Sequence, residues 1–157
     1  IHCTELPDLE MAQDYAGRVH YSRGTGNCGH YYIDRDGSIQ QYVAVDRIAH
    51  HVRGRNADSI GIELVNTGRY PEWFHSRHQA MSEPYPAPQM AALAQLLRWL
   101  PSQLPSLRTI AGHEDLDTTW EVASDDPTQQ VPRKRDPGPR FPWSWLLEHV
   151  PLQRLRA

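Results

Sequence analysis

The sequence predicts a single α/β domain in which helices pack on a β-sheet. The chain has 157 residues, the size of one domain that can bury a core without disulfides or a structural metal. Short apolar-alternating runs typical of strands recur along it, and segments with helical periodicity separate them. Strands separated by helical connections favour a sheet covered by helices. We therefore expect one domain over residues 1–157, with its core in about residues 1–150.

The N-terminal region is predicted to form a strand and then a helix. Residues 1–4 are a short apolar-alternating run that ends in the loop-forming sequence Glu-Leu-Pro-Asp, so His2 lies near a strand end. Residues 8–20 have partial helical periodicity, with Asp8 at the N-cap position and Glu10 in the first turn.

A β-hairpin and a further strand are predicted next. Residues 30–33 and 38–43 have the pattern of two strands, and an Asp-Gly pair supplies the positive φ angles of the tight turn between them. Residues 59–66 form another strand with alternating apolar residues, in which Glu63 faces the other way. A charge inside a buried strand is costly unless it has a partner, which singles out Glu63.

A long irregular segment leads into the longest predicted helix. Residues 67–87 are aromatic and rich in proline, too long for a plain connection, and are expected to wall a site. Within them, Trp73 and Phe74 are expected either to line a groove or to pack locally. A helix with one apolar face then begins at Ala87 and is expected to end at Pro101.

The last third is predicted to contain one more strand and a closing helix. Residues 107–112 form the strand, which delivers His113 at its tip. Residues 118–131 are expected to be a loop. The closing helix is expected over residues 141–150.

Composition and charge exclude several classes of protein. The net charge of -3 at pH 7 argues against nucleic acid as a partner, because such binders carry a basic excess on one face. No apolar run approaches the ~20 residues of a transmembrane helix, so none is expected. Cys3 and Cys28 are too few for a disulfide framework. We expect two separate buried thiols, with a single bridge between them as the alternative.

One short segment brings a cation and a carboxylate together. Residues 134–139 are Lys-Arg-Asp-Pro-Gly-Pro. A residue before proline is restricted to extended geometry, so Asp136 and Lys134, two residues apart, are expected to project from the same side. Lys134 is the only lysine among 16 basic residues, and this use of a compact point charge indicates a function. A solvated basic loop is the alternative.

The sequence also contains a candidate set of metal ligands at strand ends and in loops: His2, His113 and Asp136. Two imidazoles and one carboxylate, with a fourth position left to water, form an accepted catalytic zinc arrangement. Glu63 would supply a base for the water, and Lys134 a positive charge for the oxyanion. Any one of these histidines is more often structural, so the prediction depends on the combination.

Five segments of the chain resemble, in order, the signatures of the type 2 N-acetylmuramoyl-L-alanine amidases. This zinc amidase superfamily (Amidase_2) includes AmpD-like bacterial amidases, phage lysozyme-type amidases and peptidoglycan recognition proteins. The segments are residues 1–4, 30–37, 59–64, 111–114 and 134–139. The resemblance implies a central mixed β-sheet flanked by helices and one zinc ion. It also implies hydrolysis of the amide between the lactyl group of N-acetylmuramic acid and L-alanine, in peptidoglycan or in a muropeptide fragment.

The resemblance also implies roles for individual residues. Three residues match the family's zinc ligands: His2, His113 and Asp136. Glu63 matches the catalytic carboxylate of the AmpD-like branch, and Lys134 matches its oxyanion-stabilising lysine. Phage enzymes instead have a cysteine as third ligand and a tyrosine just before the histidine of the second motif. Here those positions are Asp136 and Gly29, so the chain sides with the AmpD-like branch.

Other polar residues are candidates for substrate contact. His50 and His51 fall where the family's groove tends to pass. Arg53 and Asn56 would meet the acidic stem peptide, since arginine pairs well with carboxylates. A packing role or a solvated loop is the alternative for all four. His30 is expected to be a structural hydrogen bonder, and no site role is expected for His20, His75, His78 and His149.

Three other functions compete with an amidase. Residues 113–117 resemble the H-E-x-x-H motif of zinc proteases, but that motif needs a helix, and a strand before it and a loop after it argue against one. A non-catalytic peptidoglycan-binding module is the main alternative, although the complete ligand set favours catalysis. No repeat or coiled-coil pattern supports a structural protein. The sequence does not fix the compartment, the oligomeric state or any protein partner.

Overall fold

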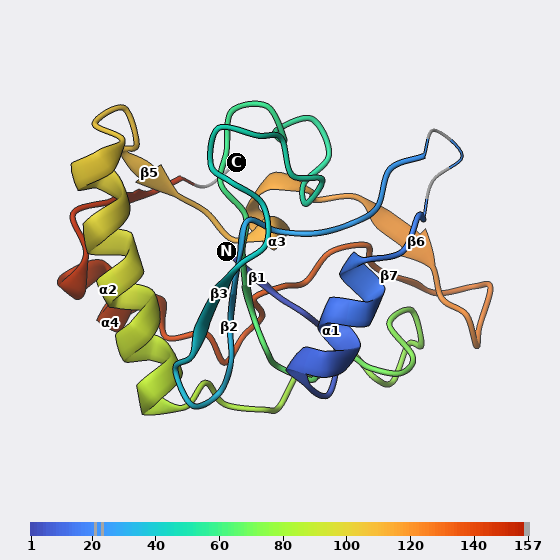
Figure 1. Ribbon diagram of the computed structural model, residues 1–157. Helices are drawn as coiled ribbons and strands as arrows, with labels where there is room; N and C mark the ends of the chain where they lie inside the picture. Colours follow the sequence, from blue (N-terminus) through green and yellow to red (C-terminus); the bar gives the residue numbers. More distant parts are fainter. Residues whose placement is uncertain (21, 23, 156–157) are drawn as a thin grey trace.

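A four-stranded sheet forms the centre of the computed structural model, which describes residues 1–20, 22 and 24–155 (Figure 1). Its order across the sheet is β1 (His2–Cys3), β4 (Ile62–Leu64), β2 (Tyr31–Ile33) and β3 (Ile39–Gln41). β4 is parallel to both β1 and β2, whereas β3 is antiparallel to β2. The expected mixed sheet and the 30–43 hairpin are therefore confirmed.

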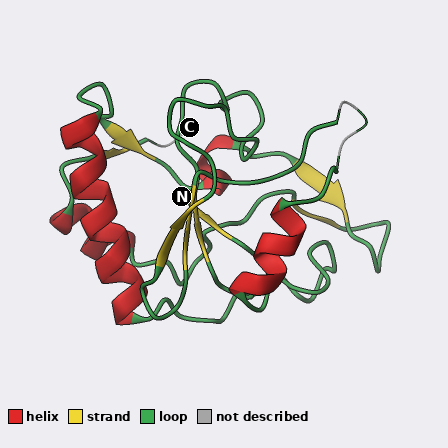
Figure 2. Ribbon diagram, viewed as in Figure 1, coloured by secondary structure: helices red, strands yellow, loops and turns green. Residues whose placement is uncertain are grey.

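Helices cover both faces of this sheet, as Figures 1 and 2 show. Successive residues of a strand point to opposite faces. Tyr31 and Ile33 accordingly join the main core with helix α2 (Ala87–Gln103), whereas Tyr32 packs with Ala12 of helix α1 (Leu9–Ala16). The result is three layers, with the sheet between α1 and α2.

Helix α1 begins as predicted but ends earlier. The Asp8 side chain caps it by accepting a hydrogen bond from the Met11 N–H at 2.8 Å. The helix stops at Ala16 rather than continuing to residue 20. Beyond that point the apolar Val19 is 69% exposed, so no core contact stabilises another turn.

Helix α2 continues through Pro101, so the predicted end at this proline is wrong. The proline lies in the last turn, where its missing N–H removes only one helical hydrogen bond. Leu100 is buried in the core, and its carbonyl accepts a hydrogen bond from the Leu104 N–H at 2.8 Å. Core packing therefore stabilises a final helical turn, although the proline alone predicted that the helix would end before it.

The structure contains four elements that the sequence did not predict. The expected loop 118–131 holds most of an antiparallel hairpin, β6 (Trp120–Val122) and β7 (Gln130–Pro132). All three residues of β6 are exposed, so this strand lacks the alternation of buried and exposed residues that reveals a strand in a sequence. Strand β8 (Gln153–Arg154) pairs in parallel with β5 (Thr109–Ile110), and residues His113–Leu116 form a single helical turn, α3.

Helix α4 (Trp143–His149) closes the fold and packs beside α2 through the buried Leu146. It corresponds to the predicted closing helix. Cys3 and Cys28 are both free thiols, as expected, but only Cys3 is buried, whereas Cys28 is partly exposed. Among the described residues, no helix has the length and apolar character needed to cross a bilayer.

Candidate metal and catalytic site

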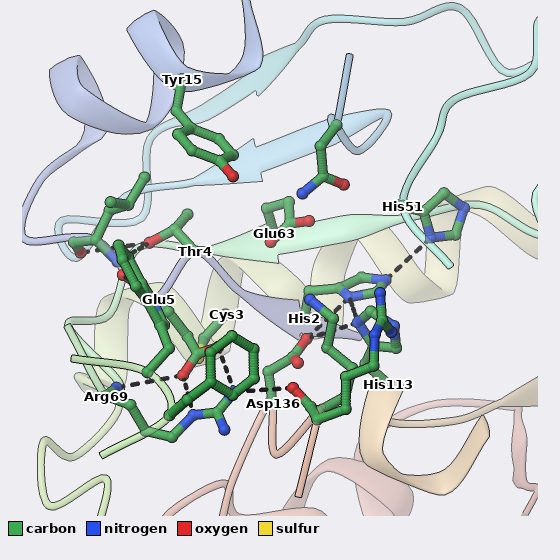
Figure 3. Close-up of a pocket in the computed structure, with 16 residues that line it drawn as sticks. His2, Cys3, Thr4, Glu5, Tyr15, His51, Glu63, Arg69, His113 and Asp136 are labelled. Atoms are coloured by element: carbon green, nitrogen blue, oxygen red, sulfur yellow. Dashed lines mark hydrogen bonds and ion pairs between the residues drawn. The ribbon is translucent and has the colours of Figure 1, made fainter. Parts of the chain in front are cut away.

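A hollow of about 250 Å³ beside the sheet collects the residues predicted to carry chemistry (Figure 3). His2 of β1 and Glu63 of β4 are register partners in neighbouring parallel strands. His113 begins α3, and Lys134 and Asp136 follow β7. All five residues line the hollow. Lys134 and Asp136 therefore both contribute to its wall.

Backbone hydrogen bonds tie together the three segments that meet here. The His113 N–H donates to the Ile1 carbonyl at 3.1 Å, and the Glu114 N–H donates to the Asp136 carbonyl at 3.0 Å. These bonds join the start of β1, the start of α3 and the loop after β7. As a result, the side chain of His113 meets that of His2, 111 residues away in sequence, and that of Asp136, 23 residues away.

His2, His113 and Asp136 form a small triangle of potential ligand atoms. His2 Nδ1 lies 3.0 Å from His113 Nδ1 and 2.9 Å from Asp136 Oδ2, and His113 Nδ1 lies 3.2 Å from the same oxygen. All three side chains are buried. Two ligands of a tetrahedral ion with bonds of about 2.0 Å lie about 3.3 Å apart. The triangle can therefore hold one divalent metal ion.

The electrostatics of the triangle also suit a cation. Burial lowers the pKa of His2 well below its ordinary value, so its imidazole is neutral. Burial alone would raise the pKa of Asp136, but His113 and His2 hold it well below the ordinary range. Neutral imidazole and ionised carboxylate are the metal-binding forms. Within the described part of the chain, Asp136 Oδ1 is buried without a hydrogen-bond partner, and a cation bound by this carboxylate would compensate for the missing partner.

Glu63 lies in the hollow with an environment that suits proton transfer. Burial, and to a lesser extent Asp136, raises the pKa of Glu63 to about 8, while Lys134 acts in the opposite direction. A carboxyl group with a pKa near neutrality can accept and return a proton. Gly29 makes room for this side chain, because a Cβ there would lie 2.9 Å from Glu63 Cγ.

His51 lines the hollow and also supports His2. Its side chain is buried, and its Nδ1 lies 3.0 Å from His2 Nε2, the ring nitrogen that does not face the triangle. The other nitrogen of His51 lies 3.3 Å from Ser59 Oγ. Such contacts fix the orientation of a ligating imidazole. Sequence reasoning proposed His51 for substrate contact and missed this positioning role.

The other substrate candidates surround a neighbouring hollow that Lys134 also lines. His50 and Arg53 are exposed there. The side-chain oxygen of Asn56 accepts hydrogen bonds from the His51 and Val52 N–H groups at 3.0 and 2.8 Å, which organises the loop itself. These contacts give Asn56 a structural role in the loop.

His30 has the structural role that was expected. Its Nδ1 accepts a hydrogen bond from the Gly61 N–H at 3.0 Å, and its Nε2 lies 3.0 Å from the Arg47 carbonyl oxygen. Both ring nitrogens are therefore engaged by the backbone. The ring is almost fully buried and fixes the loop before β4.

A buried ion pair in the wall of the hollow was not predicted. Arg69 Nε lies 2.6 Å from Glu5 Oε1, and both side chains are buried. The Arg69 guanidinium also donates to the carbonyls of Pro132 and Arg133, immediately before Lys134. Arg69 thus links the connection between β4 and α2 to the segment that carries Lys134 and Asp136. No local sequence pattern identifies such a long-range pair.

Residues 113–117 do not form a protease-like motif, although the helical turn α3 corrects the expectation of no helix there. Asp117, the fifth residue, pairs with Arg133 and accepts a hydrogen bond from the Thr119 N–H at 3.2 Å. It is thus held by neighbours other than the two histidines of the triangle. The single turn positions His113 alone for the metal site.

The fold and the triangle define a class: an α/β protein with a buried centre of two histidines and one carboxylate that could hold a metal. The chain belongs to the Amidase_2 family, described as N-acetylmuramoyl-L-alanine amidase, whose sequence model matches residues 1–139. The family resemblance noted in the sequence is therefore confirmed.

Individual relatives agree with this assignment. The 1,6-anhydro-N-acetylmuramyl-L-alanine amidase AmpD of Enterobacter cloacae is 32% identical over 121 residues, 71% of this chain and 51% of that protein. AmpDh3 of Pseudomonas aeruginosa, solved with an anhydromuramic pentapeptide, has a TM-score of 0.69 and 25% identity over 94% of this chain and 57% of its own. AmiD of E. coli has the same TM-score at 22% identity, covering 94% and 55%, and supports the fold. The chain spans about half the length of these relatives.

Proposed function

We propose that this chain is a zinc-dependent N-acetylmuramoyl-L-alanine amidase. It would hydrolyse the amide that joins the lactyl group of N-acetylmuramic acid to L-alanine in peptidoglycan or muropeptides. The observation that carries the proposal is the buried triangle of His2, His113 and Asp136 with Glu63 in the same hollow. Family membership supplies the substrate class.

Zinc is the ion that suits this donor set best. Two imidazoles and one carboxylate leave a tetrahedral ion one open position, which is the arrangement of catalytic rather than structural zinc. A hard ion such as Mg²⁺ prefers oxygen ligands, and Cu(II) prefers nitrogen and oxygen ligands in a square-planar or tetragonal arrangement rather than a tetrahedral one. His2, His113 and Asp136 would therefore hold one Zn²⁺. When bound, the ion would act as a Lewis acid and lower the pKa of water towards neutrality.

The remaining residues would move the proton and stabilise charge. Glu63 would accept a proton from the attacking water and later deliver one to the departing nitrogen of L-alanine. The ammonium group of Lys134 would stabilise the negative charge that develops on the carbonyl oxygen. His51 would keep the His2 ring oriented. The raised pKa of Glu63 supports a group that exchanges a proton in both directions.

Two relatives favour an anhydro-muropeptide as substrate. AmpD of E. cloacae is named for a 1,6-anhydro-N-acetylmuramyl substrate, and AmpDh3 was solved with an anhydromuramic pentapeptide. In this chain the wall of the hollow includes Trp73 and Phe74, whose faces suit a sugar ring. We propose the anhydro-muropeptide as the first substrate to test and intact peptidoglycan as the second.

The test is cleavage of a purified 1,6-anhydro-N-acetylmuramyl peptide by the chain loaded with Zn²⁺, followed by mass spectrometry. The expected products are the free anhydro sugar and a peptide with an L-alanine N-terminus, and removal of zinc by a chelator should abolish them. Binding of the peptide without cleavage, with zinc present, would instead identify a peptidoglycan-binding module.

A further inference from the structure

A second group of metal-binding side chains lies on the wall segment, residues 69–79, between β4 and α2. Glu72, His75 and His78 are spaced by three residues. Three successive backbone bonds repeat at this spacing, from the N–H of each residue to the carbonyl three positions earlier, at 3.1, 3.1 and 3.0 Å. Turns of three residues place every third side chain on one side of the backbone. The local fold therefore gathers these three side chains.

Their potential ligand atoms are close enough to share one ion. One ligand atom from each residue lies within 4.8 Å of the others. His78 Nδ1 is 2.7 Å from Glu72 Oε2, and the rings of His75 and His78 are stacked with centroids 4.2 Å apart. Glu72 and His78 are exposed and His75 is partly buried, so a cation can reach the group from solvent.

Neighbouring residues hold this turn in place before any ion binds. The carboxylate of Asp125, in the β6–β7 connection, accepts hydrogen bonds from Ser76 N–H and Oγ–H, each at 2.7 Å. Its Oδ2 lies 3.4 Å from His75 Nδ1, the kind of contact that orients a metal-binding imidazole. The side-chain amide of Gln79 donates to the carbonyls of Trp73 and His75. Figure 1 shows this segment, drawn in green, near the β6–β7 hairpin and far from α2.

We propose that Glu72, His75 and His78 form a second site for a divalent cation of the zinc class. Two imidazoles and one carboxylate suit such borderline ions better than Mg²⁺ or Ca²⁺, which prefer oxygen ligands. The site is separate from the triangle in the hollow and does not depend on the proposed hydrolysis. Trp73 and Phe74, which line the hollow, belong to the same segment. Occupancy would therefore fix the wall against which a substrate binds.

The test is the zinc content of the full chain after equilibration with excess Zn²⁺ and removal of free ion, measured by mass spectrometry of the metal. The wild type should hold about two ions per chain. A His75→Ala/His78→Ala variant should hold about one, and His113→Ala should also hold about one, by loss of the other site. His149→Ala is the matched control, because His149 is an exposed histidine stacked on Trp145, and it should retain about two.

A calorimetric titration separates this site from the hollow. In the His113→Ala background, Zn²⁺ should still bind at one site, and adding Glu72→Gln should weaken that binding by at least about tenfold. Zinc content unchanged in His75→Ala/His78→Ala, or a dissociation constant weaker than about 1 mM in the His113→Ala background, would overturn the proposal. Circular dichroism checks that each variant is folded, and Glu72→Gln alone serves if the double variant is not.

Discussion

Small residues create the space in which the proposed catalytic side chains lie. A Cβ at Gly61 would lie 2.4 Å from the His51 ring, and one at Gly29 would lie 2.9 Å from Glu63 Cγ. Both distances are shorter than real Cβ contacts allow, so these glycines leave room for the His51 ring and for the Glu63 side chain. Residue 29 is also where phage enzymes of the superfamily carry a tyrosine. A tyrosine here would displace Glu63, which agrees with the carboxylate-based mechanism proposed above.

Replacing Glu63 should separate catalysis from metal binding. Glu63→Ala is expected to lower kcat on the muropeptide by a factor of about 10² to 10⁴, the contribution of a general acid–base group. It should retain its zinc, because Glu63 is not part of the triangle. His113→Ala should lose both activity and the ion of the hollow. Full activity of Glu63→Ala would remove this residue from the mechanism.

Replacing His51 should weaken the metal site without removing a ligand. His51→Ala leaves His2 Nε2 without its partner at 3.0 Å. Loss of such an outer contact typically costs about 10- to 100-fold in metal affinity, and we expect a change of that size for the ion in the hollow. The exposed neighbour His50 provides the control, and His50→Ala should bind zinc as the wild type does. Equal affinities of the two variants would contradict the positioning role.

At the scale of elements, the site depends on loops that are anchored to rigid strands. β1 and β4 fix His2 and Glu63 in register, while His113 and Asp136 come from segments without long regular structure. The wall segment reaches the site through Arg69, which contacts Glu5 after β1 and the backbone after β7. One buried guanidinium thus joins three segments around the hollow.

Removing the charge of Arg69 should therefore be strongly destabilising. Arg69→Met leaves the Glu5 carboxylate buried without its partner, and breaking a buried ion pair in this way costs about 3–5 kcal/mol. Arg18, which pairs with Asp14 on the surface of α1, is the comparison. Arg18→Met should cost less than about 1 kcal/mol. Chemical denaturation of both variants measures the difference. Similar losses of stability would show that the buried ion pair stabilises the protein no more than the exposed one.

At the scale of the whole molecule, two cores on opposite faces of one sheet support a site at its edge. The larger core packs α2 and α4 on the sheet, and the smaller one packs α1. Arg35 connects distant parts of this structure, because it pairs with Glu83 before α2 at 2.6 Å and donates to the Pro7 carbonyl before α1 at 2.8 Å. Glu83 also accepts a hydrogen bond from the Thr67 N–H at 2.6 Å.

This connection predicts a loss of stability in acid. Partial burial of Glu83 opposes ionisation, but Arg35 and Thr67 outweigh it and lower the pKa of Glu83 in the folded protein. A carboxyl group with a lowered folded pKa stabilises the protein above its unfolded pKa of about 4.3, and this contribution disappears as pH falls through the folded value. Denaturation from pH 7 to pH 3 should show Glu83→Gln less stable than wild type at neutral pH. The gap should close below about pH 4, and a constant gap would refute the linkage.

Local sequence patterns predicted much of the fold because they reflect interactions between residues that are close in sequence. The Asp-Gly turn identified the hairpin, alternation identified β4, and Asp8 identified the start of α1, since a turn, a strand face and a cap involve only neighbouring residues. The end of α2 and the β6–β7 hairpin were missed for a common reason. The first depends on packing of Leu100 in the core, and the second on pairing between strands of which β6 is fully exposed.

The sequence by itself determined the family and the chemical types of the site residues: two histidines, two carboxylates and a single lysine. These follow from residue identity and from the order of the motifs, both of which can be read from the unfolded chain. Only the tertiary structure decided that His2, His113 and Asp136 meet within about 3 Å, that His51 supports His2, and that Arg69 joins the wall to the ligand segment. Such contacts join residues tens to more than a hundred positions apart, and their distances are set by the packing of the whole chain.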